Sequence, residues 1–382
     1  MSALESISTR LVYTEDQALL RDEARRLLAA RVSIEAVRAL LDDDGGDDPA
    51  LWAELGRMGW LGLLTEAEYG GAGLGAVELS ILAEEAGRTL LPTPILAHLL
   101  ATAVLARGGS TSQRAEWLPR LATGELRATW AHVEANGAWR VADTSVASAG
   151  GRLHGTKAFV WAGNTADVFL VPVQVDEEVR IALVPSNAAG VRVESEQTLD
   201  RTRRQGRLVL VDAEPVGLLE RPAAEVEQDF LPLAWTAIAA ESVGGAAAAL
   251  DRTAAYAATR EQFGKAIGSF QAIKHPLVNV LIDTEQARSL VYAAACAIDQ
   301  SNDDAVLLAR MAKARSSDAY GFATSRAIQF HGGFGFTEEC DAHLFRRRAL
   351  ASRPALGDPD HHRAAIADLV LGPSAAGATA LD

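Results

Sequence analysis

The chain has 382 residues, 49% of them hydrophobic and 23% charged, which is typical of a globular protein long enough for two or three domains. Lys and Arg number 36 and Asp and Glu 50, and the resulting net charge of −14 argues against nucleic acid as the main partner. The two cysteines, Cys296 and Cys340, have no CxxC spacing, and we expect no apolar run to be long enough for a membrane span, so we expect a cytoplasmic protein without disulfides or a thiolate metal site.

The first third of the chain is predicted to be helical. Thr14 and Gln17 have the spacing of a capping box, and the apolar residues after them recur on one helical face. Further helical patterns cover residues 48–64, 76–90 and 113–125. We therefore assign residues 1–125 to an N-terminal helical domain.

From about residue 127 the hydrophobic period changes. Short β-branched, apolar runs follow one another between Gly, Asn and Pro residues, as in "DVFLVPV" and "GRLVLVDA". Such runs are typical of strands in an antiparallel barrel or sandwich. We predict an antiparallel β-barrel domain over residues 126–225.

The last part of the chain returns to helical patterns. Long helices are predicted over about Leu231–Arg260, Phe270–Asp299 and Asp303–Phe330. We assign residues 226–372 to a helical bundle domain and expect a disordered tail over 373–382. The complete chain is thus predicted to have an α+β fold, with helices, then strands, then a bundle.

The segment "TREQFGKAIGSFQAIKH", residues 259–275, joins two of the long helices. Arg260 ends one helix, where its guanidinium could form a forked contact with a phosphate, and Phe263 could stack on a planar ring. The alternative is a structural role, with an arginine at a helix C-terminus and a phenylalanine in the core.

A second segment, "QFHGGFGFTEE", follows the third long helix. Gly332 and Gly333 could open the backbone to a pyrophosphate, with Gln329 beside them. The alternative is a helix that ends at a glycine and continues into a turn.

Together the two segments resemble the acyl-CoA dehydrogenase family, and the order of helices, strands and helices over nearly the whole chain is also that family's order. The resemblance implies an N-terminal helical domain, a middle β-barrel and a C-terminal four-helix bundle. It also implies FAD bound at a subunit interface, desaturation of an acyl-CoA, and an electron-transfer flavoprotein as acceptor. The residues that match the family's FAD-contacting motifs, and that would reach the FAD of a neighbouring subunit, are Arg260, Gln262, Phe263, Gln329, Gly332 and Gly333.

The strand region departs from the family pattern. Glu134 is kept, but Ala135 stands where the family has a proline. Lys157 and Phe159 are kept, whereas Trp161 replaces a small hydroxyl residue that bonds the flavin. The flavin pocket of this chain itself is therefore in doubt, and a core role for Phe159 and Trp161 is the alternative.

The position of the catalytic base is the main departure. The reaction needs a carboxylate that removes the α-proton of the thioester, and the family's motif places Leu356 there, followed by Gly357 and Asp358. A leucine cannot accept a proton. Some members carry the base on the helix before Arg260, where this chain has Ala234.

Further losses and possible replacements surround this site. Trp235 stands where related enzymes have a substrate-contacting arginine. Asp358 and Glu241 could replace the missing base, although a turn-capping role suits Asp358 better. The nearby "DPDHH" could suggest a metal, but it has the composition of an exposed turn.

The resemblance extends to actinobacterial steroid-degrading members that are built from two different subunits, of which one lacks the base. We therefore expect a non-base-bearing subunit of an α2β2 heterotetramer, whose homologous partner would bind most of the acyl-CoA substrate. The alternatives are a self-sufficient homotetramer that uses Asp358, and a catalytically silent flavin-fold protein with a structural or binding role.

Overall fold

The computed structural model describes residues 13–43 and 45–372. The predicted tail, 373–382, lies outside the described residues. The N-terminal segment folds into α1 (Glu15–Arg31), α2 (Ile34–Ala39), α3 (Pro49–Arg57), α4 (Ala76–Thr89), α5 (Ile95–Gly108) and α6 (Thr111–Ala122). The predicted capping box is confirmed, because the Thr14 hydroxyl accepts from the Gln17 N–H at 3.2 Å and the Gln17 side chain accepts from the Thr14 N–H at 3.1 Å.

The middle segment forms one mixed sheet, with the strand order β6-β7-β3-β2-β4-β5-β8 and β1 paired with β4. Its strands are β1 (Ala128–Trp130), β2 (Ala147–Ala149), β3 (Arg152–Trp161), β4 (Val168–Val175), β5 (Glu178–Pro185), β6 (Val191–Glu196), β7 (Gln205–Ala213) and β8 (Gly217–Leu218).

The predicted antiparallel barrel is wrong in two respects. The sheet does not close, since β6 and β8 end the strand order without pairing with each other. It is also not wholly antiparallel, since β1 and β2 both run parallel to β4. Alternation of apolar residues predicts that a segment is a strand, but it does not predict which strands lie side by side or in which direction.

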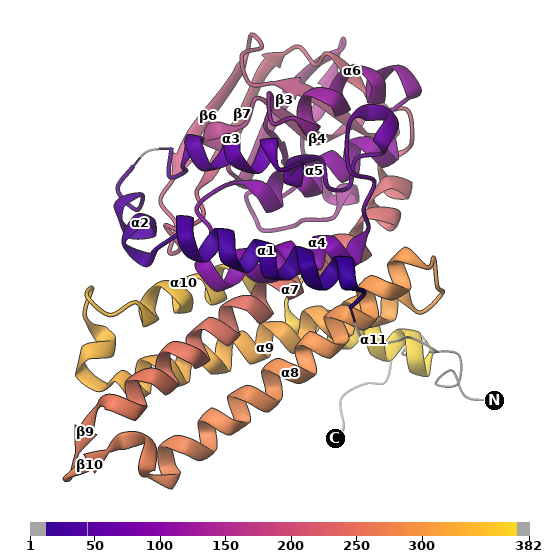
Figure 1. Cartoon of the computed structure of the whole chain (residues 1–382). Coiled ribbons are helices and arrows are strands. Elements are labelled where there is room, and N and C mark those ends of the chain that lie inside the picture. Colours follow the sequence, from indigo (N-terminus) through magenta and orange to yellow (C-terminus); the bar gives the residue numbers. More distant parts are fainter. Residues whose placement is uncertain (1–12, 44, 373–382) are drawn as a thin grey trace, which may run out of the picture.

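The C-terminal segment consists of long helices followed by two short ones. Its elements are α7 (Ala223–Thr259), the hairpin β9 (Glu261–Gln262) and β10 (Lys265–Ala266), α8 (Gln271–Asp299), α9 (Ala305–His331), α10 (Ala342–Ser352) and α11 (Pro359–Leu371). Figure 1 shows α7, α8 and α9 side by side below the sheet and the N-terminal helices, with the β9–β10 hairpin at the far end of the bundle.

Helix α7 is the core of the bundle. Contrary to the expectation from sequence, it contains an 18-residue window with a mean hydropathy of 1.3, long and apolar enough to cross a membrane. That window is 94% buried inside the protein, because α4, α8 and α9 pack around it.

Two glycines let α4 and α7 cross closely. A Cβ placed on Gly87 would lie 2.0 Å from the Glu241 carbonyl oxygen, and one on Gly244 would lie 1.8 Å from the Glu84 carbonyl oxygen. Any other residue at either position would force the two helices apart. This crossing joins the N-terminal helices to the bundle.

Candidate functional site

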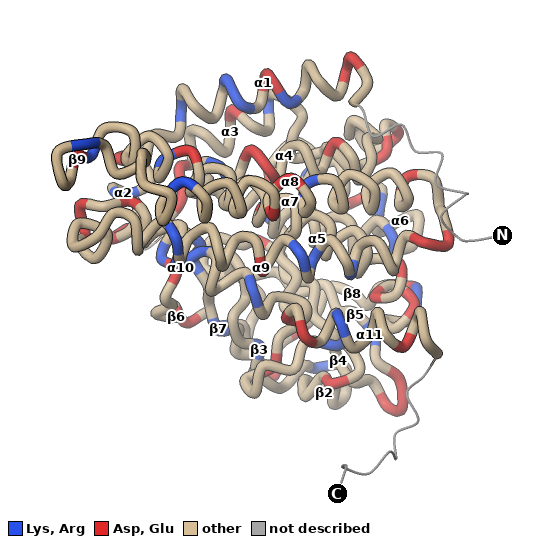
Figure 2. The backbone as a smooth tube through the Cα atoms, turned by 90° about the horizontal axis from the view of Figure 1, so that it is seen from below, with Lys and Arg blue, Asp and Glu red and all other residues tan. Residues whose placement is uncertain are grey.

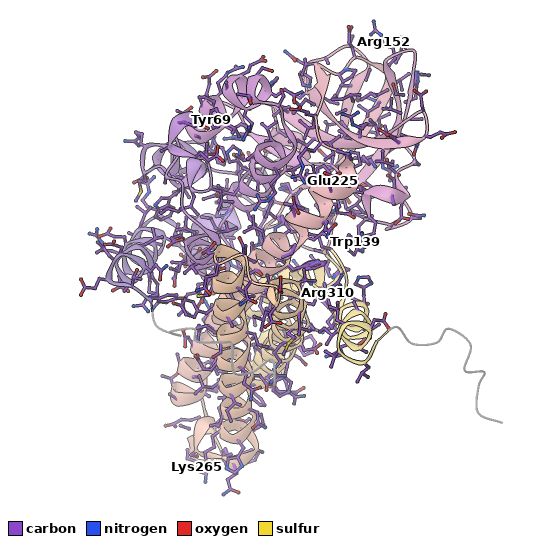
Figure 3. All side chains as sticks on the ribbon, turned by 90° about the vertical axis from the view of Figure 1, so that its right-hand side faces the viewer. Tyr69, Trp139, Arg152, Glu225, Lys265 and Arg310 are labelled. Atoms are coloured by element: carbon purple, nitrogen blue, oxygen red, sulfur yellow. The ribbon has the colours of Figure 1, made fainter. Side chains whose placement is uncertain are left out.

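The six residues of the two sequence motifs lie together. Arg260, Gln262, Phe263, Gln329, Gly332 and Gly333 all line one open groove of about 890 Å³ at the end of the bundle. The groove lies between the end of α7, the β9–β10 hairpin, the start of α8 and the end of α9. Labelled Lys265 marks this hairpin at the outer end of the bundle (Figure 3). The sequence therefore predicted a real cluster, although it could not show the groove.

The structure distinguishes between the binding role and the structural role considered for Arg260 and Phe263. Arg260 is the C-cap residue of α7 and is exposed, and within the described residues its guanidinium makes no ion pair or hydrogen bond. Phe263 is 93% exposed and has a φ of 55°, so the structural reading of Phe263 as a core residue is wrong. An exposed cation at the end of α7 and an exposed ring in the adjoining hairpin thus both line the open groove.

Gly332 ends α9 and also opens the groove. Its φ of 60° and ψ of −140° require a glycine, and its own N–H donates to the Gln329 carbonyl. A Cβ placed on Gly332 or Gly333 would meet no atom within 4 Å, so the backbone here is open to a close approach. A guanidinium, an open glycine backbone and aromatic surfaces together suit a ligand with phosphates and a ring.

Sequence reasoning missed an aromatic stack that forms one wall of this groove. The rings of Tyr256 and His331 are stacked with centroids 4.3 Å apart, and Phe334 lies 6.2 Å from Tyr256. The His331 Nδ1 lies 2.7 Å from the Ala327 carbonyl oxygen, which fixes the ring at the end of α9. One signal was available: Tyr256 comes one helical turn before Arg260 and therefore shares its face.

A second cavity, of about 520 Å³ and open to solvent, lies between the sheet, α5, α7 and α10, and Leu356 forms part of its wall. Leu356 is only 6% exposed, and its carbonyl accepts a hydrogen bond from the Trp235 indole N–H at 2.9 Å. Ala234, the other family base position, is fully buried. The residues at both base positions are thus aliphatic, and Trp235 braces the backbone beside one of them.

Neither of the two candidate replacement bases reaches this cavity. Asp358 caps α11, and its carboxylate accepts from the His361 N–H at 2.8 Å, which lowers the pKa of Asp358 below its usual value. Glu241 is buried and forms ion pairs with Arg203 and, at 3.0 Å, with Arg348. Both carboxylates have structural roles in this chain.

The buried Arg348 connects three parts of the fold. Its guanidinium, on α10, also contacts Asp200 at 2.5 Å and the Thr202 hydroxyl at 2.6 Å in the loop before β7, while Glu241 belongs to α7. Arg203, from the same loop, lies 4.2 Å over the Trp161 ring. This network of charges leaves a cavity of only about 40 Å³ beside Trp161 and Glu241.

In the strand region, the structure shows the contacts of the residues that keep or depart from the family pattern. Glu134 and Lys157 form a buried ion pair, and Lys157 also donates to the Thr144 hydroxyl at 2.8 Å. Phe159 is 44% exposed, so the core reading is wrong for this residue, whereas Trp161 is half-buried and lines both cavities, the one of about 520 Å³ and the one of about 40 Å³.

The "DPDHH" segment forms the start of α11. His361 and His362 pack edge-on against the rings of Trp139 and Trp235, with centroids 5.5 and 5.2 Å apart. Among residues 13–43 and 45–372, no three His, Cys, Asp or Glu side chains are placed to hold a metal ion together.

Comparisons with known proteins agree with this architecture. Residues 14–125 match the family model "Acyl-CoA dehydrogenase, N-terminal domain" and residues 225–371 the model "Acyl-CoA dehydrogenase, C-terminal domain". The acyl-CoA dehydrogenase IpdE2 of Mycolicibacterium smegmatis is 30% identical over 91% of this chain and 96% of its own length. The chain therefore belongs to the acyl-CoA dehydrogenase family, whose enzymes are oxidoreductases acting on the CH–CH bond of an acyl-CoA.

Two solved structures are similar over almost their full length. The first is a variant of the Tcur3481–Tcur3483 steroid ACAD, with a TM-score of 0.85, 31% identity, and coverage of 94% of this chain and 98% of that one. The second is the ChsE4–ChsE5 complex from Mycobacterium tuberculosis, with a TM-score of 0.87, 27% identity, and coverage of 96% and 100%.

Proposed function

We propose that this chain is the non-base-bearing subunit of a heteromeric, FAD-dependent acyl-CoA dehydrogenase that desaturates an acyl-CoA between Cα and Cβ. The proposal depends on one observation: this chain retains the cofactor-contacting residues of the family but lacks the catalytic base. The groove at the end of the bundle keeps all six motif residues, while the base position holds the buried side chain of Leu356. The chain is thus equipped to contact a cofactor but not to remove a proton.

The reaction assigns separate tasks to the two subunits. When bound, FAD, the cofactor of the family, would supply an acceptor for the hydride that leaves Cβ. In this chain Arg260 would offset the charge of the pyrophosphate, the backbone at Gly332 and Gly333 would approach it closely, and Phe263 would cover a ring face. The carboxylate that takes the α-proton would come from the partner, because the wall of this chain's own cavity contains no charged side chain.

The position of the groove supports a role in a neighbouring active site. In Figure 3 the hairpin marked by Lys265 is at the outer end of the bundle, far from Trp139, which lines the 520 Å³ cavity near the sheet. A cofactor held in the groove would therefore react in a centre built mainly by another chain. Two similar structures carry the names of two proteins each, which fits an α2β2 assembly.

The substrate class and the electron acceptor are assigned by analogy with the relatives. One is described as a steroid acyl-CoA dehydrogenase, and we extend steroid degradation to this chain on that basis. Electron-transfer flavoprotein is the acceptor expected from the family.

Figure 2 shows basic and acidic residues interspersed along the described backbone in this view, without a basic face for a polyanion. A cytoplasmic location fits these assignments.

Co-expression with a base-bearing homologue tests the proposal. We expect the complex to purify with flavin and to desaturate an acyl-CoA, whereas this chain alone is expected to be inactive and to contain little flavin. Mass measurement and flavin absorption of each preparation, with turnover assays, provide the readouts. A chain that is soluble alone, holds one FAD per subunit and turns over would contradict the proposal.

The alternative homotetramer predicts an essential Asp358. We expect instead that Asp358→Ala lowers the free energy of unfolding by about 1 kcal/mol, because it removes the N-cap of α11. Turnover of the complex should stay within about twofold of wild type, since a cap acts on stability and not on the transition state. Chemical denaturation and initial rates measure the two effects, and Ser110→Ala, at the N-cap of α6, is the matched control. Loss of turnover in the Asp358 variant alone would favour the homotetramer.

A further inference from the structure

The last helix, α11, is held to the rest of the chain by few buried side chains. Only two of its 13 residues are buried, Pro359 and His362, and the helix packs mainly against α9. Its C-terminal end, residues 369–371, is exposed and adds little to this packing. A helix with so little buried surface can separate locally at a lower free-energy cost than unfolding of the whole protein.

His362 is the anchor of α11, and its surroundings favour the neutral ring. The side chain is fully buried, edge-on to the Trp235 ring of α7 with centroids 5.2 Å apart. Among the described residues neither ring nitrogen has a hydrogen-bond partner. Burial, together with the positive charges of Lys313 and Arg310 on α9, lowers the pKa of His362 to about 3. Arg140, in the loop after β1, adds a further positive charge beside Arg310. A protonated His362 would therefore be a buried cation among other cations.

The carboxylates at the two ends of this contact are engaged elsewhere. Asp358, the N-cap of α11, accepts from the His361 N–H at 2.8 Å. Asp318, on α9, forms an ion pair with Arg363 of α11 on the surface. Neither carboxylate contacts His362, so a proton on the ring would gain no counter-charge from them.

The chain has a hinge directly before α11. Gly357 has a φ of 102°, a conformation that favours glycine, and it precedes the N-cap of the helix. On the other side of this hinge the buried Lys313 donates to the carbonyls of Arg353 and Gly357 at 3.0 and 3.2 Å. The turn that carries Leu356 is thus tethered to α9, whereas α11 can move as one unit. We propose that α11 is an acid-released helix: protonation of His362 detaches it from α9 and leaves the rest of the fold in place.

This device goes beyond the proposed function, because it requires neither the groove nor a partner subunit. Release of α11 would uncover one side of Trp235, whose indole N–H donates to the Leu356 carbonyl at 2.9 Å. A released His362 titrates near pH 6.5, whereas the docked ring titrates near pH 3. Because the released state binds the proton more tightly, lowering the pH from 7 to 5 should raise the released fraction about twentyfold.

Hydrogen exchange of the full-length chain, followed by mass spectrometry at pH 7 and pH 5, tests the inference. Protection is corrected for the intrinsic pH dependence of exchange, and exposed carboxylates generally take up protons only below pH 5. We expect the amides of α11 to lose about twentyfold in protection over this range. They should also exchange faster than the amides of α9 at both pH values, because α11 opens without the rest of the fold.

Two variants identify the group that takes up the proton. His362→Gln keeps a neutral polar side chain that cannot titrate, so the protection of α11 should differ less than about twofold between the two pH values. His361→Gln, an exposed position on the same helix, is the matched control and should retain most of the wild-type change. If His362→Gln does not dock α11 at all, the wild-type pH profile decides: the loss of protection must begin near pH 6.5 and not near pH 4.

Three results would overturn the inference. Equal protection of α11 and α9 would mean that α11 opens only when the whole chain unfolds. Unchanged protection of α11 between pH 7 and pH 5 would mean that its release takes up no proton. A full wild-type change in His362→Gln would place the titrating group elsewhere. The proposed subunit role is judged separately, by activity and flavin content after co-expression, so either idea can fail without the other.

Discussion

Arg260→Ala is expected to remove flavin from the proposed complex between this chain and a base-bearing partner. Arg260 is the exposed cation at the end of α7, and its forked guanidinium can form two charged hydrogen bonds to a pyrophosphate. Losing a contact of this kind costs roughly 3 kcal/mol, which corresponds to about hundredfold weaker binding. Titration of the apo-complex with FAD, followed by visible absorption, measures the change directly.

Two further variants make the Arg260 experiment specific. Arg260→Lys keeps the charge but loses the planar fork, so its affinity should lie between those of wild type and the alanine variant. Arg192→Ala, on β6, removes an arginine whose side chain is 67% exposed and lies outside the groove, and it should leave flavin binding unchanged. Wild-type affinity in Arg260→Ala would exclude the groove as the cofactor site.

Phe263 strengthens the argument that another chain completes this groove. A phenylalanine that is 93% exposed at a hairpin leaves most of a large apolar surface in water. Phe336, in the second motif, is 84% exposed in the short segment after α9 that contributes Gly332 and Gly333 to the groove. Exposed rings gathered in this way form a surface that the proposed partner subunit would cover.

Much of the helical architecture was predictable from local patterns. α1 begins at the predicted capping box, α8 begins one residue after Phe270, and α7 ends immediately before Arg260. The start of α7 at Ala223 precedes the predicted start at Leu231, because Pro232 falls inside the helix and a proline usually marks the beginning of one. The strands of the sheet were predicted, but their order and direction were not. The parallel pairing of β1 with β4, for example, joins segments about forty residues apart in sequence.

The candidate site was predictable where it depends on short motifs. The groove residues fall in two linear segments, so their types and spacing identify them. The contacts that occupy Glu241, one of the two candidate replacement bases, could not be predicted in this way. Glu241 pairs with Arg203 and Arg348, which are 38 and 107 residues away in sequence. Nothing in the local pattern of "AIAAESVGG" indicates that these arginines would reach its glutamate.

The free energy of unfolding is expected to fall steeply as the pH drops from about 6.5 towards 4. Burial lowers the pKa of His98 and His132 to about 4 and that of His362 to about 3. In the unfolded chain these histidines take up protons near pH 6.5, while in the folded protein they stay neutral. Acid therefore favours the unfolded state, and each such histidine contributes a slope of up to about 1.4 kcal/mol per pH unit.

His98 allows this prediction to be tested at one residue. It is fully buried on α5, with Nε2 3.1 Å from the Leu121 carbonyl oxygen and Nδ1 accepting from the Ala128 N–H at 3.2 Å. The neutral ring with its proton on Nε2 satisfies both contacts, whereas a second proton on Nδ1 would oppose the Ala128 N–H. The cation is thus disfavoured by geometry as well as by burial.

His98→Gln should therefore reduce the pH slope by about 1.4 kcal/mol per unit, whatever it does to stability at neutral pH. Urea denaturation at several pH values between neutral and mildly acidic gives the slope for each variant. His275→Gln, an exposed position on α8, is the control and should keep the wild-type slope. An unchanged slope in the His98 variant would mean that the folded protein accommodates a charged ring at this position. The interpretation of His98 as a neutral ring that links α5 to α6 and β1 would then be wrong.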